Sequence, residues 1–213
     1  ANECWFYQNT AAVCAAVRLN DDSQGHFTGC LFQDNTAHSC GGALTFWISG
    51  PNFVERCTFA GNVSPSSGAA IWSEKISETY ILDCTFYRNH ASDATVLAGN
   101  HTVVLENCLL AFASQGAAVA SPYGYAKLTC CDIYGNAGGD WVGSIADQYG
   151  IRGNISEDPL LCAPWTGDYR LDAASPCAEE NNPECGQIGA WGIGCGQTPA
   201  APSSWGAIKT LFR

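Results

Sequence analysis

Cysteine is the residue type in this chain that is most able to take part in chemistry, because it is frequent and regularly spaced. The sequence has 13 cysteines, and thiols can form disulfides, hold zinc or attack a substrate. No cysteine pair or Cys/His cluster has the spacing of a zinc site, and the four histidines are scattered. A catalytic thiol needs a neighbouring base, which the residues around the cysteines do not offer. The cysteines therefore indicate disulfides and buried thiols, and their number favours an oxidising, extracellular setting. Because the number is odd, at least one thiol is unpaired or pairs with another chain.

Six of the cysteines mark a repeat of roughly 25 residues. Each is followed two residues later by an apolar residue and, in five of the six copies, five residues later by asparagine. The cysteines are Cys4, Cys30, Cys57, Cys84, Cys108 and Cys131, and the apolar residues are Phe6, Phe32, Phe59, Phe86, Leu110 and Ile133. The asparagines are Asn9, Asn35, Asn62, Asn89 and Asn136, and Ala113 is the exception. Six copies of one pattern indicate one structural unit repeated along the chain.

The segments before these cysteines predict strands. "NFVERC", "TYILDC" and "TVVLENC" are rich in β-branched and apolar residues, and glycine-rich turns separate them. A short, helix-free repeat of this kind is typical of one coil of a β-solenoid, whose coils stack in parallel about 4.8 Å apart. We therefore expect the cysteines to form one inner column and the phenylalanines another. The asparagines would form a third column, in which each side chain bonds to neighbouring coils and satisfies the polar groups of a turn.

Two further motifs carry a family resemblance. "CGGAL" at 40–44 and "SGAAI" at 67–71 follow the Phe-x-x-Asn motif, and this order resembles the right-handed parallel β-helix proteins. It is most similar to polymorphic outer-membrane-protein repeats, and residues 154–195 resemble the closing segment of secreted bacterial β-helix proteins. The resemblance implies an all-β, right-handed parallel β-helix of about six coils at 1–153. A loop-rich, disulfide-containing C-terminal cap would follow at 154–196, then a linker and apolar tail at 197–213. The motifs indicate fold and not function, because this coil serves enzymes, adhesins and stalks alike.

The register assigns the remaining cysteines. Cys14 and Cys40 occupy the same place in consecutive coils, within disulfide distance, and we predict a bond between them. The main column is predicted to be mostly reduced thiol. Cys130 should point outward and pair with the closing segment. Four cysteines in that loop-rich segment are disulfide candidates with open connectivity: Cys162, Cys177, Cys185 and Cys195.

Carboxylates are the groups that a polysaccharide lyase or glycosidase would use, with Ca²⁺ and a basic residue in a lyase. Glu55, Asp83 and Glu106 precede their cysteines, but no continuous column of acids results, and the basic residues fall in different columns. The loop acids Asp21 and Asp22 could hold Ca²⁺ but are more typical of solvated turns. Asp140 and Trp141 could meet a sugar, although capping of the last coil is the stronger interpretation. We therefore predict no catalytic, metal or cofactor site.

Charge narrows the choice of partner. Nine basic against 20 acidic residues give a net charge of −11, which argues against nucleic acid, anionic membranes and polyanionic substrates. The chain has no long apolar run and no charged-then-apolar start, so we expect no membrane span and a removed export signal.

The two ends suggest assembly. The chain begins almost on the first cysteine strand, which we expect to leave an open coil edge. At the other end "QTPAAPSS" is typical of a linker, and "SWGAIKTLFR" is an apolar peptide. It is expected either to act as a sorting signal or to dock on a neighbour through Trp205, Ile208, Leu211 and Phe212, and to be disordered if it does not dock. We predict a non-catalytic extracellular structural protein that assembles head to tail into a fibre or surface layer. The alternatives are a carbohydrate-active β-helix enzyme and a carbohydrate-binding or adhesin module. Either is expected to have a groove with an aromatic platform and two or more acids within about 10 Å of each other.

Overall fold

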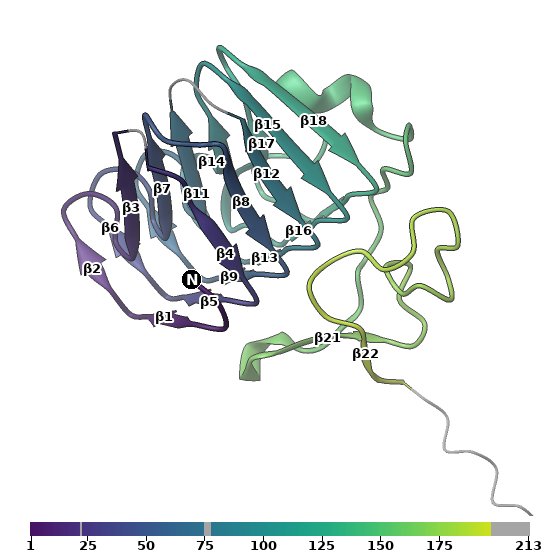
Figure 1. Cartoon of the computed structure of the whole chain (residues 1–213). Helices are drawn as coiled ribbons and strands as arrows, with labels where there is room; N and C mark the ends of the chain where they lie inside the picture. Colours follow the sequence, from purple (N-terminus) through teal and green to yellow (C-terminus); the bar gives the residue numbers. More distant parts are fainter. Residues whose placement is uncertain (22, 75–77, 197–213) are drawn as a thin grey trace, which may run out of the picture.

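The computed structural model describes residues 1–21, 23–74 and 78–196, and its main body is a parallel β-solenoid (Figure 1). Three parallel sheets form its sides. The first sheet is β1 (Trp5–Tyr7), β5 (Leu31–Gln33), β9 (Thr58–Ala60), β13 (Thr85–Tyr87), β16 (Leu109–Ala111) and β19 (Asp132–Tyr134). The second is β2 (Thr10–Ala11), β6 (Thr36–Ala37), β10 (Val63–Ser64), β14 (His90–Ala98), β11 (Ile71–Glu74), β7 (Leu44–Trp47) and β3 (Val17–Asn20), with β17 (Gln115–Ala120) paired to β14. The third is β4 (His26–Thr28), β8 (Asn52–Glu55), β12 (Thr79–Leu82), β15 (Thr102–Glu106) and β18 (Tyr125–Thr129).

The six strands of the first sheet correspond to the six predicted copies. A bridge between Asp132 and Ile155 begins a further turn. The first sheet pairs Phe6 with Phe32 and Phe32 with Phe59, the register expected from the repeat. Each of its strands is bounded by corner residues with a left-handed backbone, one directly before the repeat cysteine and one directly before the repeat asparagine or its counterpart. The first set is Glu3, Gly29, Arg56, Asp83, Asn107 and Cys130, and the second is Gln8, Asp34, Gly61, Arg88, Phe112 and Gly135.

The predicted cysteine column is confirmed. The sulfurs of Cys30, Cys57 and Cys84 each accept a hydrogen bond from the cysteine amide of the preceding coil, at 3.5, 3.4 and 3.4 Å. The six thiols are free, and from Cys30 onwards they are buried. Burial raises the pKa of Cys84, Cys108 and Cys131 well above its usual value, so these groups remain protonated thiols. They act as small packing residues and not as nucleophiles.

The phenylalanine column stacks ring on ring. The ring centroids are 4.6 Å apart for Phe6 and Phe32, 4.7 Å for Phe32 and Phe59 and 4.9 Å for Phe59 and Phe86, with the planes within 6° of parallel. Isolated aromatic pairs prefer offset or edge-to-face contacts. Here the rung spacing imposes stacking, because successive rings leave equivalent backbone positions about 4.8 Å apart.

The asparagine column is a continuous hydrogen-bonded ladder in the first four coils. The Nδ2 atoms of Asn9, Asn35 and Asn62 donate to the Oδ1 atom of the next asparagine at 2.8, 2.9 and 2.9 Å. Each acceptor oxygen also takes the backbone amide of the preceding asparagine. After the interruption at Ala113, Asn136 Oδ1 accepts the Ala113 amide at 3.0 Å.

Side chains from the 3₁₀ helix η1 (Gly143–Gln148) and its neighbours close the last coil. Gln148 Oε1 accepts the Leu128 amide at 2.9 Å, and its Nε2 donates to the Ala126 carbonyl at 2.7 Å, so one amide side chain replaces the next strand. Asn154 does the same for Cys131 and Leu128. These bonds satisfy backbone groups that an edge strand would otherwise expose.

The rest of the segment predicted as a cap runs back along the outer face of the first sheet (Figure 1). It contains β20 (Leu161–Ala163), the 3₁₀ helix η2 (Pro164–Thr166), β21 (Asp168–Asp172) and β22 (Ile193–Cys195). We call residues 157–195 the closing segment. Its backbone reaches Thr85 through the amide of Ala190 at 2.9 Å, and the Trp191 indole donates to Thr58 Oγ1 at 2.7 Å. The segment therefore lies beside the solenoid over several coils.

Two disulfides hold the closing segment, Cys130–Cys185 and Cys162–Cys195. The first joins it to the solenoid, as expected for an outward Cys130, because Cys130 occupies a left-handed corner position. Cys177 is a free thiol that donates to Asp132 Oδ2 at 3.1 Å beneath the segment.

The predicted Cys14–Cys40 bond is absent, because both thiols are free. The backbones stack as expected, with the Cys14 amide 3.0 Å from the Cys40 carbonyl oxygen. Cys14 is left-handed at φ +58°, whereas Cys40 does not share this conformation. Their Cβ atoms therefore leave the stacked backbones in different directions, and a disulfide needs converging Cβ vectors.

Candidate functional site

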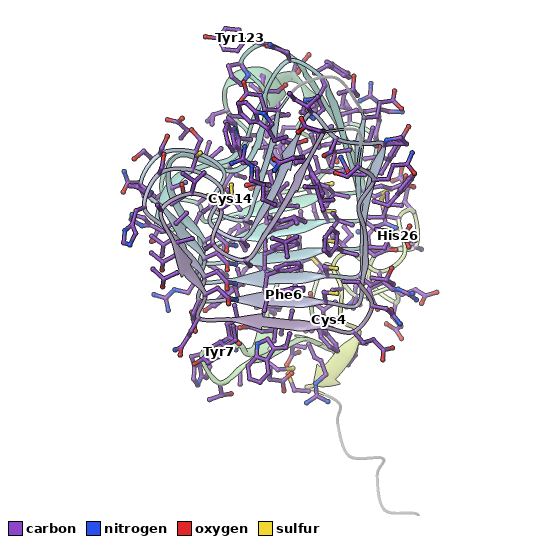
Figure 2. The ribbon with its side chains drawn as sticks, turned by 60° about the vertical axis from the view of Figure 1, so that its left-hand side comes forward. Cys4, Phe6, Tyr7, Cys14, His26 and Tyr123 are labelled. Carbon is purple, nitrogen blue, oxygen red and sulfur yellow. A yellow bond between two sulfur atoms is a disulfide. The ribbon has the colours of Figure 1, made fainter. Side chains whose placement is uncertain are left out.

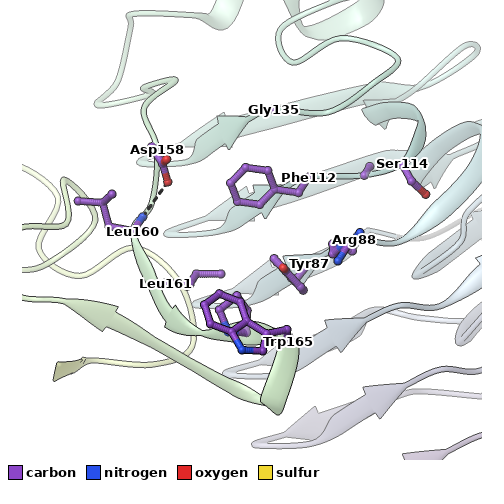
Figure 3. A pocket seen from close by; sticks show the side chains of 11 residues that line it. Tyr87, Arg88, Phe112, Ser114, Gly135, Asp158, Leu160, Leu161 and Trp165 are labelled. Carbon is purple, nitrogen blue, oxygen red and sulfur yellow. Dashed lines mark hydrogen bonds between the residues drawn. The ribbon is translucent and has the colours of Figure 1, made fainter.

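A groove lies between the outer face of the first sheet and the closing segment. It consists of two adjoining cavities of about 570 and about 610 Å³. Both are lined by Tyr87, Arg88 and Ser114 from the solenoid and by Pro164 and Trp165 from the closing segment. Figure 3 shows Trp165 on the side of the groove facing Tyr87 and Phe112, with Arg88 and Ser114 at one end and Asp158 at the other. Cavities of this size suit a few sugar units or a comparable ligand.

The solenoid wall is built from the two variable positions of the Phe-x-x-Asn motif. The phenylalanine points inward and the asparagine turns into the ladder, so the two residues between them face outward. In the fourth coil these are Tyr87 and Arg88, and in the second coil they are Gln33 and Asp34, all of which line the groove. The left-handed corner at the second variable position projects Arg88 and Phe112 towards the closing segment. The repeat thus holds an irregular set of side chains on a regular frame.

The closing segment supplies the opposite wall. Trp165, on η2, is 75% exposed, which leaves its ring free to contact a ligand. Tyr169 on β21 is buried, with its ring centroid 5.8 Å from that of Tyr87. Burial, with smaller contributions from Asp34 and Tyr87, raises the pKa of Tyr169 to about 12, so its hydroxyl stays protonated. The Cys162–Cys195 disulfide ties β20 to β22 behind this wall.

Polar groups lie around the aromatic centre. Within the described part of the chain Arg88 forms no salt bridge, so its guanidinium donors are available to a ligand. His90 Nδ1 lies 2.9 Å from Ser114 Oγ, and both residues line the second cavity. One carboxylate lines each cavity, Asp158 in the first and Asp34 in the second. The groove therefore combines ring faces with separated donors and acceptors.

The carboxylates considered from the sequence do not converge. Glu55 faces outward on the third sheet and lies 3.5 Å from His26, and Asp83 bonds to Asn107 at a corner. Asp140 accepts the amides of Gly135 and Asn136. Among the described residues no group of three or more His, Cys, Asp or Glu side chains could hold a metal ion.

Trp141 takes part in capping. It packs against the core cluster that contains Ile145, and its indole donates to the Ile155 carbonyl at 3.0 Å. Asp22 and the assembly residues Trp205, Ile208, Leu211 and Phe212 lie outside the described residues.

The sequence reasoning missed the groove residues, although a signal was present. Within an otherwise regular motif, the two variable positions change from Gln-Asp to Ala-Gly to Tyr-Arg in successive coils. Positions that vary in a repeat are free of the packing that fixes the others, and they mark the outward surface. Nothing local identified Trp165 as their partner.

No helix in the described part of the chain is long and apolar enough to cross a membrane.

Comparison with known proteins gives one match. The family model described as "Right handed beta helix region" matches residues 2–121, more than half of the chain. No curated protein and no solved structure matches. The match covers the first five repeat cysteines and all strands of the three stacked sheets except β18 and β19. The chain belongs to the right-handed β-helix family.

Proposed function

We propose that this protein is a non-catalytic, extracellular β-helix protein that binds a polysaccharide chain in the groove between the first sheet and the closing segment. The observation that carries the proposal is the exposed Trp165 ring facing Tyr87 and Phe112 across the groove (Figure 3). Polar groups at the two ends complete the site. The aromatic platform supports the carbohydrate-binding alternative.

The chemistry of a sugar ring fits this lining. A pyranose has apolar C–H faces and a rim of hydroxyl groups. The faces pack on aromatic rings, which supply a large apolar area at low entropic cost. The hydroxyls need both donors and acceptors, which Arg88, Ser114 and Asp158 offer. A purely apolar ligand would leave these groups without partners, which costs free energy.

Binding without cleavage is supported by the placement of the acids. Glycoside hydrolysis uses two carboxylates on either side of one bond. Here each cavity has a single lining carboxylate, and the two belong to different cavities. The Ser114–His90 pair has an exposed hydrogen bond, and no carboxylate is bonded to the His90 side chain in the described structure.

An extracellular or cell-surface location is part of the proposal. Its support is the pair of disulfides that hold the groove wall, since such bonds persist in oxidising compartments. The similarity of the GGA[I/L] and Phe-x-x-Asn motifs to polymorphic outer-membrane-protein repeats points the same way.

Glycan binding by the purified protein tests the function. We expect retention on one or more immobilised polysaccharides, and a loss of affinity on the order of tenfold for Trp165→Ala. Tyr123→Ala is the matched control, because Tyr123 is 82% exposed and lies outside the groove. Absence of binding across neutral, acidic and amino-sugar polymers would overturn the proposal, and so would a Trp165→Ala variant that binds as the wild type does.

The head-to-tail fibre stays a second prediction from the sequence. Its contact residues at 203–213 lie outside the described residues. Electron microscopy and size-exclusion chromatography test it: growing filaments would support it, and a strictly monomeric particle would contradict it.

A further inference from the structure

The floor of the groove continues beyond its walls along the outer face of the first sheet. The register places Tyr87 beside Ala60, Ala60 beside Gln33, and Gln33 beside Tyr7. The first three of these residues line the groove. Tyr7 is the next member of the same column, so a straight chain that follows the floor along the solenoid axis arrives at the first coil.

An exposed aromatic pair stands at that end of the column. Tyr7 is 43% exposed and Trp5 is 63% exposed, and their ring centroids are 5.0 Å apart. Figure 2 shows Phe6 and Tyr7 on opposite sides of β1, with the closing segment on the Tyr7 side. The pair therefore shares the face that carries the groove.

The pair is dispensable for packing the coil. Phe6 supplies the inward ring of the same strand and stacks on Phe32. Among the residues described, the rings of Trp5 and Tyr7 make no aromatic contact beyond each other. Large exposed aromatics that do not support the core are typical of recognition surfaces.

The path between the two aromatic sites is open to a polar chain. Trp191 of the closing segment sits on Thr58, which belongs to the neighbouring column of Trp5 and Leu31. In the column of Tyr7 Ala60 is buried and Gln33 is half-buried, but the adjoining corner residues Gly61, which is half-buried, and Asp34, which is exposed, line the second cavity beside them. A ligand can therefore follow the corner beside this column, where Gln33 offers a hydrogen-bonding side chain and Gly61 lets the ligand approach the sheet.

We propose that Trp5 and Tyr7 form a second sugar-stacking subsite, so that the protein recognises an extended, uncharged polysaccharide lying along the solenoid axis. This inference rests on the proposed function of the groove. Tyr7 and Tyr87 are three rungs apart, about 14 Å at about 4.8 Å per rung. One extended β-linked pyranose unit is about as long as one rung, so only an oligosaccharide of several units reaches both sites. An uncharged chain fits because Asp34 lies beside the path and the protein carries a net charge of −11.

Titration calorimetry with oligosaccharides of increasing length tests the subsite. The probes are cello-, xylo- and chito-oligosaccharides from disaccharide to octasaccharide. We expect the wild-type affinity to rise on the order of tenfold once the ligand spans both sites, because the second contact becomes intramolecular. Trp5→Ala should abolish this rise and leave the affinity for short ligands unchanged. Trp165→Ala should lower the affinity at every length, and Tyr123→Ala should change neither.

The outcomes separate the two proposals. If no oligosaccharide of any length binds, the proposed function of the groove fails, and the subsite with it. If short ligands bind and Trp5→Ala keeps the rise with length, the groove stands and the subsite is overturned. Sedimentation velocity adds a third arm: if Trp5→Ala converts an oligomer to a monomer without changing glycan affinity, the pair is a contact between copies of this chain, which also overturns the subsite. Circular dichroism of Trp5→Ala should match the wild type, since the inner Phe6 is retained.

Discussion

The two faces of the first sheet differ in how strictly they repeat. The inner face carries Phe6, Phe32, Phe59 and Phe86 in four successive coils. The outer column one residue further on changes at every step, in the order Tyr7, Gln33, Ala60, Tyr87, Ala111 and Tyr134. Inner residues must fit identical neighbours above and below, so one residue type recurs. Outer residues meet solvent or the closing segment and can vary. Folding and binding are thus assigned to opposite faces of the same short strands.

The largest effect should come from breaking the inner face. Phe59→Ala removes a fully buried ring between Phe32 and Phe86, and we expect a loss of about 3–5 kcal/mol in the free energy of unfolding. Tyr87→Ala, one coil away on the outer face, should lower stability far less and weaken glycan binding. Urea denaturation followed by circular dichroism measures both. Equal destabilisation by the two changes would contradict the division between the faces.

A smaller loss of stability is expected when the asparagine ladder is interrupted. Asn62 Nδ2 donates to the Phe32 carbonyl at 2.9 Å, and its Oδ1 accepts the Asn35 amide at 3.1 Å. Asn62→Ala leaves these buried backbone groups unpaired and should cost on the order of 3 kcal/mol. Asn9→Ala is the control, because Asn9 is exposed and water can replace its side chain. Similar urea midpoints for the two variants would show that the ladder does not stabilise the fold.

The smallest expected change in stability comes from a titrating group on the outer face of the first sheet, where the closing segment covers it. Asp132 is buried there and accepts the Glu157 amide and the Cys177 thiol at 3.0 and 3.1 Å. Burial raises the pKa of Asp132 to about 7. The folded protein therefore keeps a proton that the unfolded chain has lost, so this contribution is fully present below about pH 4 and is lost as the pH rises through about 7.

The wild-type free energy of unfolding should therefore fall by about 2 kcal/mol between about pH 5 and about pH 7 from this group alone. Asp132→Asn should remove that slope, because an amide does not titrate. Urea melts of both proteins across this range provide the measurement. An unchanged slope in the variant would assign the pH dependence to other groups.

The inner architecture could be predicted from the sequence, because aligning the copies of a repeat shows which residues of successive coils lie beside each other. Once the cysteines align, Phe32 must lie beside Phe59 and Asn35 beside Asn62, and the structure places them so. The same alignment put Cys130 on the outside, where it bonds Cys185. It failed for Cys14 and Cys40, because register places backbones together but does not state the direction in which each Cβ leaves a corner.

The groove could not be predicted from the sequence, because its two walls meet only in the tertiary structure. Tyr87 and Arg88 were visible as variable positions of a motif, but nothing in the sequence near them pointed to Trp165. Their meeting requires the closing segment to turn back along the first sheet, held by Cys130–Cys185 and by the bonds of Ala190 and Trp191 to threonine hydroxyls. These contacts join residues far apart in the chain, and no periodic pattern specifies them.

By itself, then, the sequence determined which side chains stack inside the coil, because every copy repeats the same local packing problem. The fold of the closing segment decided which outward side chains face one another across a groove. That decision rests on a few long-range contacts that occur once in the molecule, and a contact made only once leaves no repeating pattern from which to infer it.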